Sequence, residues 1–139
     1  SSLFIFSIFL LIPVQEQVLD NQTTDVILIG DYSSGTVWRM DISNNYSYVY
    51  PVFSNWIYPY DIDYDPIDDV IYWIDVNWRI SSGSISGISE TTLRLLNGFA
   101  QTYGIAVDPI SRLLFYTDLG IDVIAAISLE DFMHKTIIS

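Results

Sequence analysis

Three aspartates alternate along one short segment, Asp61-Ile62-Asp63-Tyr64-Asp65. If this segment is a β-strand, side chains two residues apart share a face, so the three carboxylates would line one side of it. Converging carboxylates are typical calcium ligands, which makes the segment the best metal candidate in the sequence. The glycine and distal glutamate of an EF-hand loop are absent, however. We therefore expect these aspartates to be structural and predict no metal site.

Sequence patterns of catalysis are missing. The single histidine, His134, lies near the C-terminal end without a serine or cysteine nucleophile motif beside it, and the chain has no cysteine. Neither G-x-S-x-G nor H-E-x-x-H occurs, and residues 82–87 carry two glycines without the lysine of a phosphate loop, so we interpret them as a flexible hairpin. We predict that the protein is not an enzyme and needs no cofactor. We expect His134 to be a surface histidine rather than a pH switch.

A four-residue pattern recurs three times and sets the frame for these residues. It is Leu28-Ile29-Gly30-Asp31, then Tyr72-Trp73-Ile74-Asp75, then Phe115-Tyr116-Thr117-Asp118, with the aspartates 44 and 43 positions apart. The pairs Asp65-Pro66 and Asp108-Pro109 keep the same step of 43. A fixed period of this size predicts a repeat architecture. We expect each motif aspartate to end a strand and to accept backbone N–H groups of the following turn.

Each repeat divides into short runs rich in Ile, Val, Tyr and Trp, separated by Gly, Pro, Asp, Asn and Ser. The second and third repeats contain four such runs, whereas the first contains three. Four antiparallel strands in about 40–45 residues are typical of a β-propeller blade. We predict an all-β fold, a partial β-propeller of about two and a half four-stranded antiparallel blades, at residues 26–52, 59–96 and 103–139.

Two of the three tetrads resemble the YWTD repeat, also called the low-density-lipoprotein-receptor class B repeat. The preceding runs, Thr102–Asp108 and more weakly Pro59–Asp65, follow the inner-strand pattern Pro-x-Gly-aliphatic-Ala-aliphatic-Asp of that family. The first repeat departs from it, because Leu28 and Ile29 replace the aromatic pair. The resemblance implies a ring of six blades, so residues 21–139 would form an incomplete propeller. We expect the motif aromatics Tyr72, Trp73, Phe115 and Tyr116 to be mostly buried, because both faces of a propeller sheet pack on neighbouring blades.

The N-terminal segment Leu3–Val14 is apolar apart from one serine. It is too short to span a bilayer but fits the apolar core of a signal peptide. We predict that residues 1–20 are a truncated signal peptide and leader, with any helix confined to them; the alternative is a buried strand or helix of the folded domain. The triplets Asn21-Gln22-Thr23 and Asn45-Tyr46-Ser47 are N-glycosylation sequons, which also favours a secreted protein.

Seventeen acidic residues against five basic ones give a net charge of −12. This charge disfavours nucleic acid or an anionic membrane as partner and suits a protein partner of basic or mixed charge. Trp56 and Tyr58 lie on the predicted connection between the first two blades. Trp78 and Arg79 lie on a predicted long connection after the second tetrad. These connections emerge on the same side of a propeller, and aromatic and arginine side chains are typical of binding hot spots. We predict that they bind the ligand.

The leading hypothesis is a protein-binding propeller, secreted or at the cell surface, of a receptor related to the low-density-lipoprotein receptor. It would bind an extracellular protein or support its release, and would meet a membrane only through domains absent from this chain. One alternative is the extracellular propeller of a sevenless-like receptor tyrosine kinase. Another is a calcium-dependent hydrolase propeller of the lactonase type, which would need convergent acids such as Asp61, Asp63 and Asp65.

Overall fold

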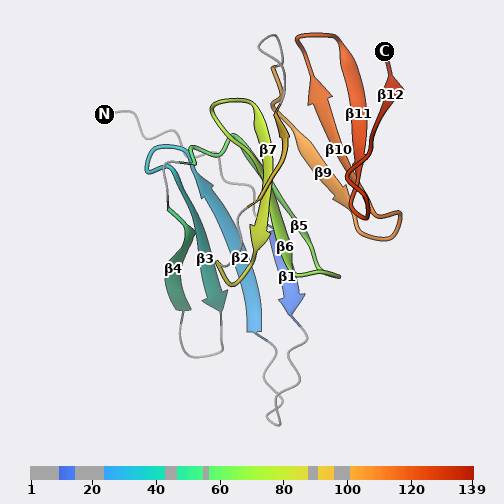
Figure 1. The fold of residues 1–139 in the computed structure, drawn as a ribbon. Helices are drawn as coiled ribbons and strands as arrows, with labels where there is room; N and C mark the ends of the chain where they lie inside the picture. The colour runs from blue at the N-terminus through green and yellow to red at the C-terminus, as the bar shows by residue number, and fades with distance from the viewer. Residues whose placement is uncertain (1–9, 15–23, 43–46, 55–56, 88–90, 96–100) are drawn as a thin grey trace.

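The computed structural model describes residues 10–14, 24–42, 47–54, 57–87, 91–95 and 101–139. They form three four-stranded antiparallel sheets that stand side by side (Figure 1), each with its strands in chain order. Sheet 1 contains β1 (Leu10–Val14), β2 (Thr24–Asp31), β3 (Thr36–Ile42) and β4 (Ser47–Phe53); sheet 2 contains β5 (Asp61–Asp65), β6 (Val70–Ile74), β7 (Arg79–Ser84) and β8 (Thr91–Leu95); sheet 3 contains β9 (Ile105–Asp108), β10 (Leu113–Asp118), β11 (Val123–Ser128) and β12 (His134–Ile138). The all-β prediction is confirmed, since no helix occurs in these ranges.

Sheet 1 gains a strand that the sequence analysis did not assign to it. β1 pairs antiparallel with β2, from Leu10 opposite Leu28 to Val14 opposite Thr24, and takes the position that β5 and β9 hold in the other sheets. The first repeat therefore has four strands instead of three, and residues 10–14 are not helical. A five-residue apolar run satisfies a strand as well as a signal-peptide core, so composition alone could not separate them. The signal peptide at residues 1–20 stays a prediction.

The third strand of sheet 2 lies earlier than predicted. β7 covers Arg79–Ser84, so only residues 75–78 connect it to β6, and the predicted long connection is wrong. The flexible hairpin is likewise confined to the turn at residues 85–87. Ser81 to Ser84 lack β-branched side chains, but Gly83 lies under the Phe53 ring of sheet 1, where a Cβ would stand 2.2 Å from the ring's Cζ. Packing between sheets, rather than propensity, places this strand.

Two apolar clusters hold the three sheets together. Alternation along β6 sends Trp73 toward sheet 1 and Tyr72 toward sheet 3, so both are buried. The cluster between sheets 1 and 2 is Val26, Leu28, Val37, Phe53, Ile57, Ile62, Tyr64, Ile71, Trp73 and Ile85. The cluster between sheets 2 and 3 is Tyr72, Ile74, Ile80, Leu114, Tyr116, Ala125, Ile127 and Leu129. Phe115 is also mostly buried, as predicted, although it points to the face of sheet 3 that no described sheet covers.

Candidate binding face

Five aromatic side chains form a continuous row across one end of the three sheets. This aromatic row consists of Tyr58, Tyr32, Tyr60, Trp78 and Tyr103. The Tyr32 and Tyr60 rings stack with centroids 5.2 Å apart, and Tyr60 and Trp78 also stack at 5.2 Å. Tyr103 meets the Trp78 ring edge-on at 5.1 Å, and Tyr58 is tilted against Tyr32 at 5.8 Å. The row joins all three repeats into one surface.

The repeat explains why these rings meet. Tyr60 directly precedes the inner strand β5 and Tyr103 lies two residues before the inner strand β9, at equivalent positions 43 residues apart. Tyr32 follows the first motif aspartate, and Trp78 occupies the turn after the second. Because equivalent turns of neighbouring blades emerge at the same end, the rings stand next to one another. Burial, together with the adjacent Tyr32 hydroxyl, raises the pKa of Tyr60, so the Tyr60 phenol stays a neutral hydrogen-bonding group.

The four predicted ligand-binding residues have different positions in this arrangement. Tyr58 and Trp78 belong to the aromatic row, and Trp56 lies outside the described residues. Arg79 is the first residue of β7, and its guanidinium pairs with the buried Asp75 carboxylate at 2.5 Å while 40% of its side chain stays exposed. The sequence analysis missed Tyr32, Tyr60 and Tyr103. Tyr60 and Tyr103 are 43 residues apart, which is the step of the repeat, and this spacing could have indicated that they occupy equivalent positions.

Two members of the row have an unusual backbone. Tyr58 has φ of 48° and Trp78 has φ of 60°, which is the left-handed region that large side chains rarely adopt. Trp78 directly precedes the third strand of its sheet, where sheet 1 has Gly35, itself at φ of 67°. A bulky residue where glycine fits better costs about 1–3 kcal/mol, and such outliers concentrate at binding sites. Asp69, Arg112 and Asp122 have the same conformation directly before other strands of the sheets, so it belongs to the turns of the repeat and does not distinguish this end.

The three motif aspartates cap the turns beneath the aromatic row. Asp31 accepts the backbone N–H groups of Ser33 and Ser34, and Asp75 accepts those of Asn77 and Arg79. Asp118 accepts the N–H groups of Gly120 and Gln101, the latter from the connection that enters the same sheet. Burial alone would raise the pKa of Asp31, but the hydrogen bonds from the two serines outweigh it and lower that pKa. The carboxylates hold turns rather than a ligand.

The candidate calcium ligands join sheets 2 and 3 instead. Asp61 accepts the backbone N–H of Ile105 at 2.8 Å, and Asp63 accepts that of Val107 at 2.6 Å. Each carboxylate also accepts the N–H of the next residue in its own strand. Asp65, fully buried, pairs with the Arg112 guanidinium at 2.6 Å. Burial raises the pKa of both Asp61 and Asp63, and the backbone hydrogen bonds partly oppose this. Among the described residues, no group of three or more potential ligands could hold a metal ion.

Acidic side chains gather at the end opposite the aromatic row. This end contains the turns that join the first strand of a sheet to the second and the third strand to the fourth. The acidic residues in these turns and at the adjacent strand ends are Asp25, Asp41, Asp65, Asp68, Asp69, Asp108, Glu130 and Asp131. Arg39 pairs with Asp41, and Arg112 pairs with Asp65 and Asp68. The motif aspartates and Asp122 lie at the end of the aromatic row, so acidic side chains occur at both ends of the sheets.

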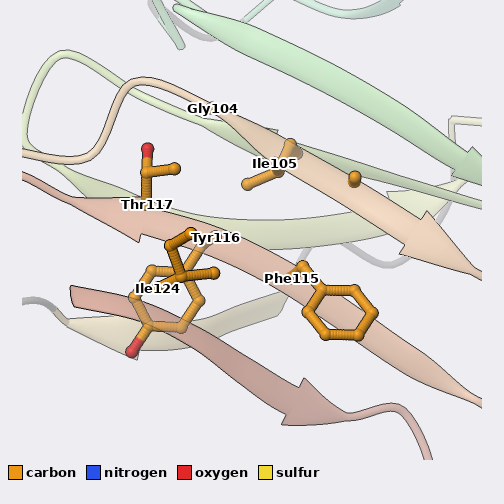
Figure 2. A pocket seen from close by; sticks show the side chains of 7 residues that line it. Gly104, Ile105, Phe115, Tyr116, Thr117 and Ile124 are labelled. Carbon is orange, nitrogen blue, oxygen red and sulfur yellow. The ribbon is translucent and has the colours of Figure 1, made fainter. Parts of the chain in front are cut away.

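Elsewhere, sheet 3 bears a shallow pocket of about 230 Å³ on its uncovered face (Figure 2). Its lining is mostly apolar and includes Phe115 and Ile124 on adjacent strands, with the Thr117 hydroxyl at one side. His134 starts β12 on the same sheet and lies 5.8 Å, ring to ring, from Tyr116. The described ranges contain no helix with the length and hydropathy needed to cross a membrane.

Comparison with known proteins supports the architecture. No protein-family model matches the chain. Nidogen-2 of Mus musculus is 32% identical over 77 residues, which are 55% of this chain and 6% of that protein. A solved chain described as the crystal structure of a nidogen/laminin complex superposes with a TM-score of 0.63 and 17% identity, over 92% of this chain and 48% of that one. The chain thus spans a small part of the curated relative and about half of the solved chain. The three sheets are therefore blades of a β-propeller, and two of their tetrads resemble the YWTD repeat.

Proposed function

We propose that this chain is a non-enzymatic, extracellular protein-binding propeller module that contacts its ligand through the aromatic row. The observation that carries the proposal is the row itself, five touching rings that cross three blades at one end. Tyrosine and tryptophan supply large contact areas at a small cost in side-chain entropy and are enriched at hot spots. The similarity to nidogen, whose solved structure is a complex with laminin, supports an extracellular setting and a protein ligand.

Arg79 adds a polar anchor beside the row. Its exposed part can donate hydrogen bonds to carbonyl or carboxylate groups of a ligand, while Asp75 holds its guanidinium in place. The net charge of −12 would still speed the approach of a ligand with basic regions, because long-range attraction does not require charges at the contact itself. A ligand of mixed charge fits both features.

The finer assignment is a matrix or receptor propeller. We keep a receptor related to the low-density-lipoprotein receptor as one form of the proposal and a sevenless-like receptor as another, since both use comparable repeats. The hydrolase alternative has less support, because Asp61, Asp63 and Asp65 are already engaged by Ile105, Val107 and Arg112.

Laminin is the first ligand to test, because it is the partner in the matched complex. Surface plasmon resonance on immobilised laminin should show saturable binding that Tyr103→Ala and Trp78→Ala each weaken about tenfold to a hundredfold. Ile110→Ala, at a 90% exposed position in the opposite end, is the matched control and should bind like the parent. Arg79→Ala is less informative because it leaves the buried Asp75 without its cation. Binding that neither aromatic substitution changes would contradict the aromatic row as the ligand site.

A further inference from the structure

The aromatic row ends in three rings that all touch one another. Tyr60 and Trp78 stack at 5.2 Å, Trp78 and Tyr103 meet edge to face at 5.1 Å, and Tyr60 and Tyr103 lie 5.8 Å apart. The planes of these pairs differ by 25°, 77° and 52°, so the rings form an angled apolar surface rather than a flat one. Each ring is at least partly exposed, and Tyr103 is exposed to 48%. A ridged segment of a ligand fits this surface better than a flat face does.

The polar groups of the row are mostly hydrogen-bond donors. The indole N–H of Trp78 and the guanidinium of Arg79 can only donate, and each tyrosine hydroxyl donates one hydrogen bond in addition to accepting. Arg79 remains 40% exposed while Asp75 holds its guanidinium. The row therefore offers several donors along a short apolar surface.

Many acceptors at the same end are already used. The three motif aspartates each accept two backbone N–H groups of the turns and connections there. The backbone carbonyls of Tyr32, Asp75 and Gln101 accept further N–H groups of these segments. Asp122, in the turn after β10, is an exposed carboxylate. A ligand that brings many acceptors, few donors and one positive charge therefore complements this end.

A proline-rich chain has this composition. Proline has no backbone N–H, and the polyproline II conformation leaves the backbone carbonyls without internal hydrogen bonds. One turn of this helix rises about 9 Å, which is close to the two 5.2 Å steps from Tyr32 through Tyr60 to Trp78. The conformation is ridged and forms before binding, so little entropy is lost, and domains that recognise it use surfaces lined by aromatic rings.

Charge adds a requirement for a basic residue in the ligand. The chain carries −12, and this end has the three motif aspartates and Asp122 against Arg79 and Arg94, which β7 and β8 bring there. The Arg79 charge is compensated by the Asp75 carboxylate. An arginine or lysine beside the prolines would be attracted to this end and could pair with Asp122 or lie over a ring face.

We propose that the aromatic row binds an extended proline-rich segment that carries an arginine or lysine next to its prolines. The inference rests on the proposed function, because it names the ligand chemistry of the same site. Proline rings of the segment pack on Tyr60, Trp78 and Tyr103, and its carbonyls accept hydrogen bonds from the hydroxyl, indole and guanidinium groups. The row recognises a backbone conformation and a charge rather than a folded surface.

Tryptophan fluorescence and calorimetry with the 139-residue chain test the proposal. The probe is a peptide of one arginine followed by ten prolines, and its matched control has alternating glycine and serine in place of the prolines. The proline peptide should bind saturably with a dissociation constant below about 1 mM, and the control peptide at least about tenfold more weakly. Either no saturable binding of the proline peptide or equal binding of the two peptides would overturn the inference.

Substitutions locate the binding of the proline peptide. Trp78→Ala and Tyr103→Ala should each weaken it about tenfold, whereas Tyr103→Phe, which keeps the ring, should weaken it only about twofold to threefold. Ile110→Ala, at the opposite end, should bind like the parent. Urea denaturation of each variant establishes that it is folded. Binding that both alanine substitutions at the row leave unchanged would place the peptide elsewhere and contradict the proposal.

Competition with laminin separates this inference from the proposed function. Laminin binding that depends on the row and is displaced by the proline peptide supports both. Laminin binding that depends on Trp78 and Tyr103, together with a proline peptide that neither binds nor competes, overturns the proline-rich ligand and leaves the proposed function standing. In that case the row accepts a folded surface. Row-dependent binding of the proline peptide without laminin binding supports the inference and excludes laminin as the ligand.

Discussion

The two junctions between neighbouring sheets are built from the same repeat but held in different ways. The junction of sheets 1 and 2 is packed by aromatic rings: Phe53 and Trp73 lie with centroids 4.9 Å apart, and Gly83 leaves room for Phe53. The junction of sheets 2 and 3 adds carboxylates, which bind backbone N–H groups of β9 and the guanidinium of Arg112. One junction depends on shape, and the other depends also on charge.

The difference arises from substitutions at two inner-strand positions. Asp61 and Asp63 in β5 correspond to Gly104 and Ala106 in β9, and Leu10 holds the position of Asp63 in β1. Only the second repeat therefore supplies carboxylates to the inner strand that follows it. A propeller repeat keeps its motif aspartate as a turn cap while the contacts between blades vary. Substitutions at each junction should consequently have separate energetic signatures.

The largest expected effect is at the aromatic junction. Trp73→Ala removes a side chain that is 1% exposed and contacts Phe53, so it should lower the free energy of unfolding by about 3–5 kcal/mol. Urea denaturation followed by circular dichroism measures this. Ile110→Ala, at a position 90% exposed, is the control and should change stability by less than about 0.5 kcal/mol. A loss below about 1 kcal/mol for Trp73→Ala would show that the ring is not core.

The next largest effect tests the charged junction. Asp65→Ala leaves Arg112 without its buried partner and the Ile67 N–H without its acceptor, and should cost about 3 kcal/mol. Asp68→Ala removes the exposed partner of the same guanidinium and should cost less than about 1 kcal/mol. Thermal melts of both variants in low and high salt measure the two costs. If the two variants lost equal stability, the buried pair of Asp65 and Arg112 would contribute no more to the free energy of unfolding than the exposed pair of Asp68 and Arg112.

A smaller loss is expected from crowding the aromatic junction. The Cβ of Gly83→Ala would lie 2.2 Å from Phe53 Cζ, so the ring must move, at a cost of about 1–3 kcal/mol. Phe53→Leu in the same chain should remove the clash and recover part of the loss. A double-mutant cycle in urea measures this coupling. If the two substitutions were additive, Gly83 would be needed for its backbone rather than for the space that it leaves.

Much of this arrangement could be predicted from the sequence, because a repeat constrains many residues at once. The spacing of the tetrads predicted the sheets. The preference of aspartate for turns predicted that Asp31, Asp75 and Asp118 accept backbone N–H groups of the following turn, and their hydrogen bonds agree with this. Propensity failed at β7, where Gly83 is required by a side chain of another sheet. It also failed at β1, whose apolar residues suit two environments equally.

The candidate site was predicted less well for a related reason. Tyr58 and Trp78 stood out by residue type, but a row of rings is a property of several blades together. Tyr32 and Tyr103 become part of it only through Tyr60 and Trp78, which contact them across blade boundaries. Likewise, Asp61 and Asp63 were metal candidates in the sequence because their spacing puts both carboxylates on one face of a strand. In the structure these carboxylates accept backbone N–H groups 44 residues away, and a sequence does not show that a carboxylate oxygen already has such a partner.

The smallest effect concerns the protonation of the charged junction. Asp63→Ala leaves the N–H groups of Val107 and Tyr64 without their acceptor and should cost about 1–2 kcal/mol, whereas Asp63→Asn keeps an acceptor oxygen and should cost less than about 1 kcal/mol. Because burial raises the pKa of Asp61 and Asp63 in the folded state, their contribution to stability is fully present below pH 3.8 and is lost as pH rises through the higher folded pKa.

Urea titrations of the parent and of an Asp61→Asn, Asp63→Asn double variant between pH 4 and pH 7 measure this contribution. The parent should lose more stability than the double variant as pH rises, since only the parent has these two carboxyls to ionise in a buried site. The cluster between sheets 1 and 2 contains no carboxyl groups, so that junction should not add to the difference in pH dependence between the two proteins. Parallel stability curves for the two proteins would show that these two carboxyls ionise as readily in the folded chain as in the unfolded one, and that the pair of Asp65 and Arg112 is the charged part of the second junction.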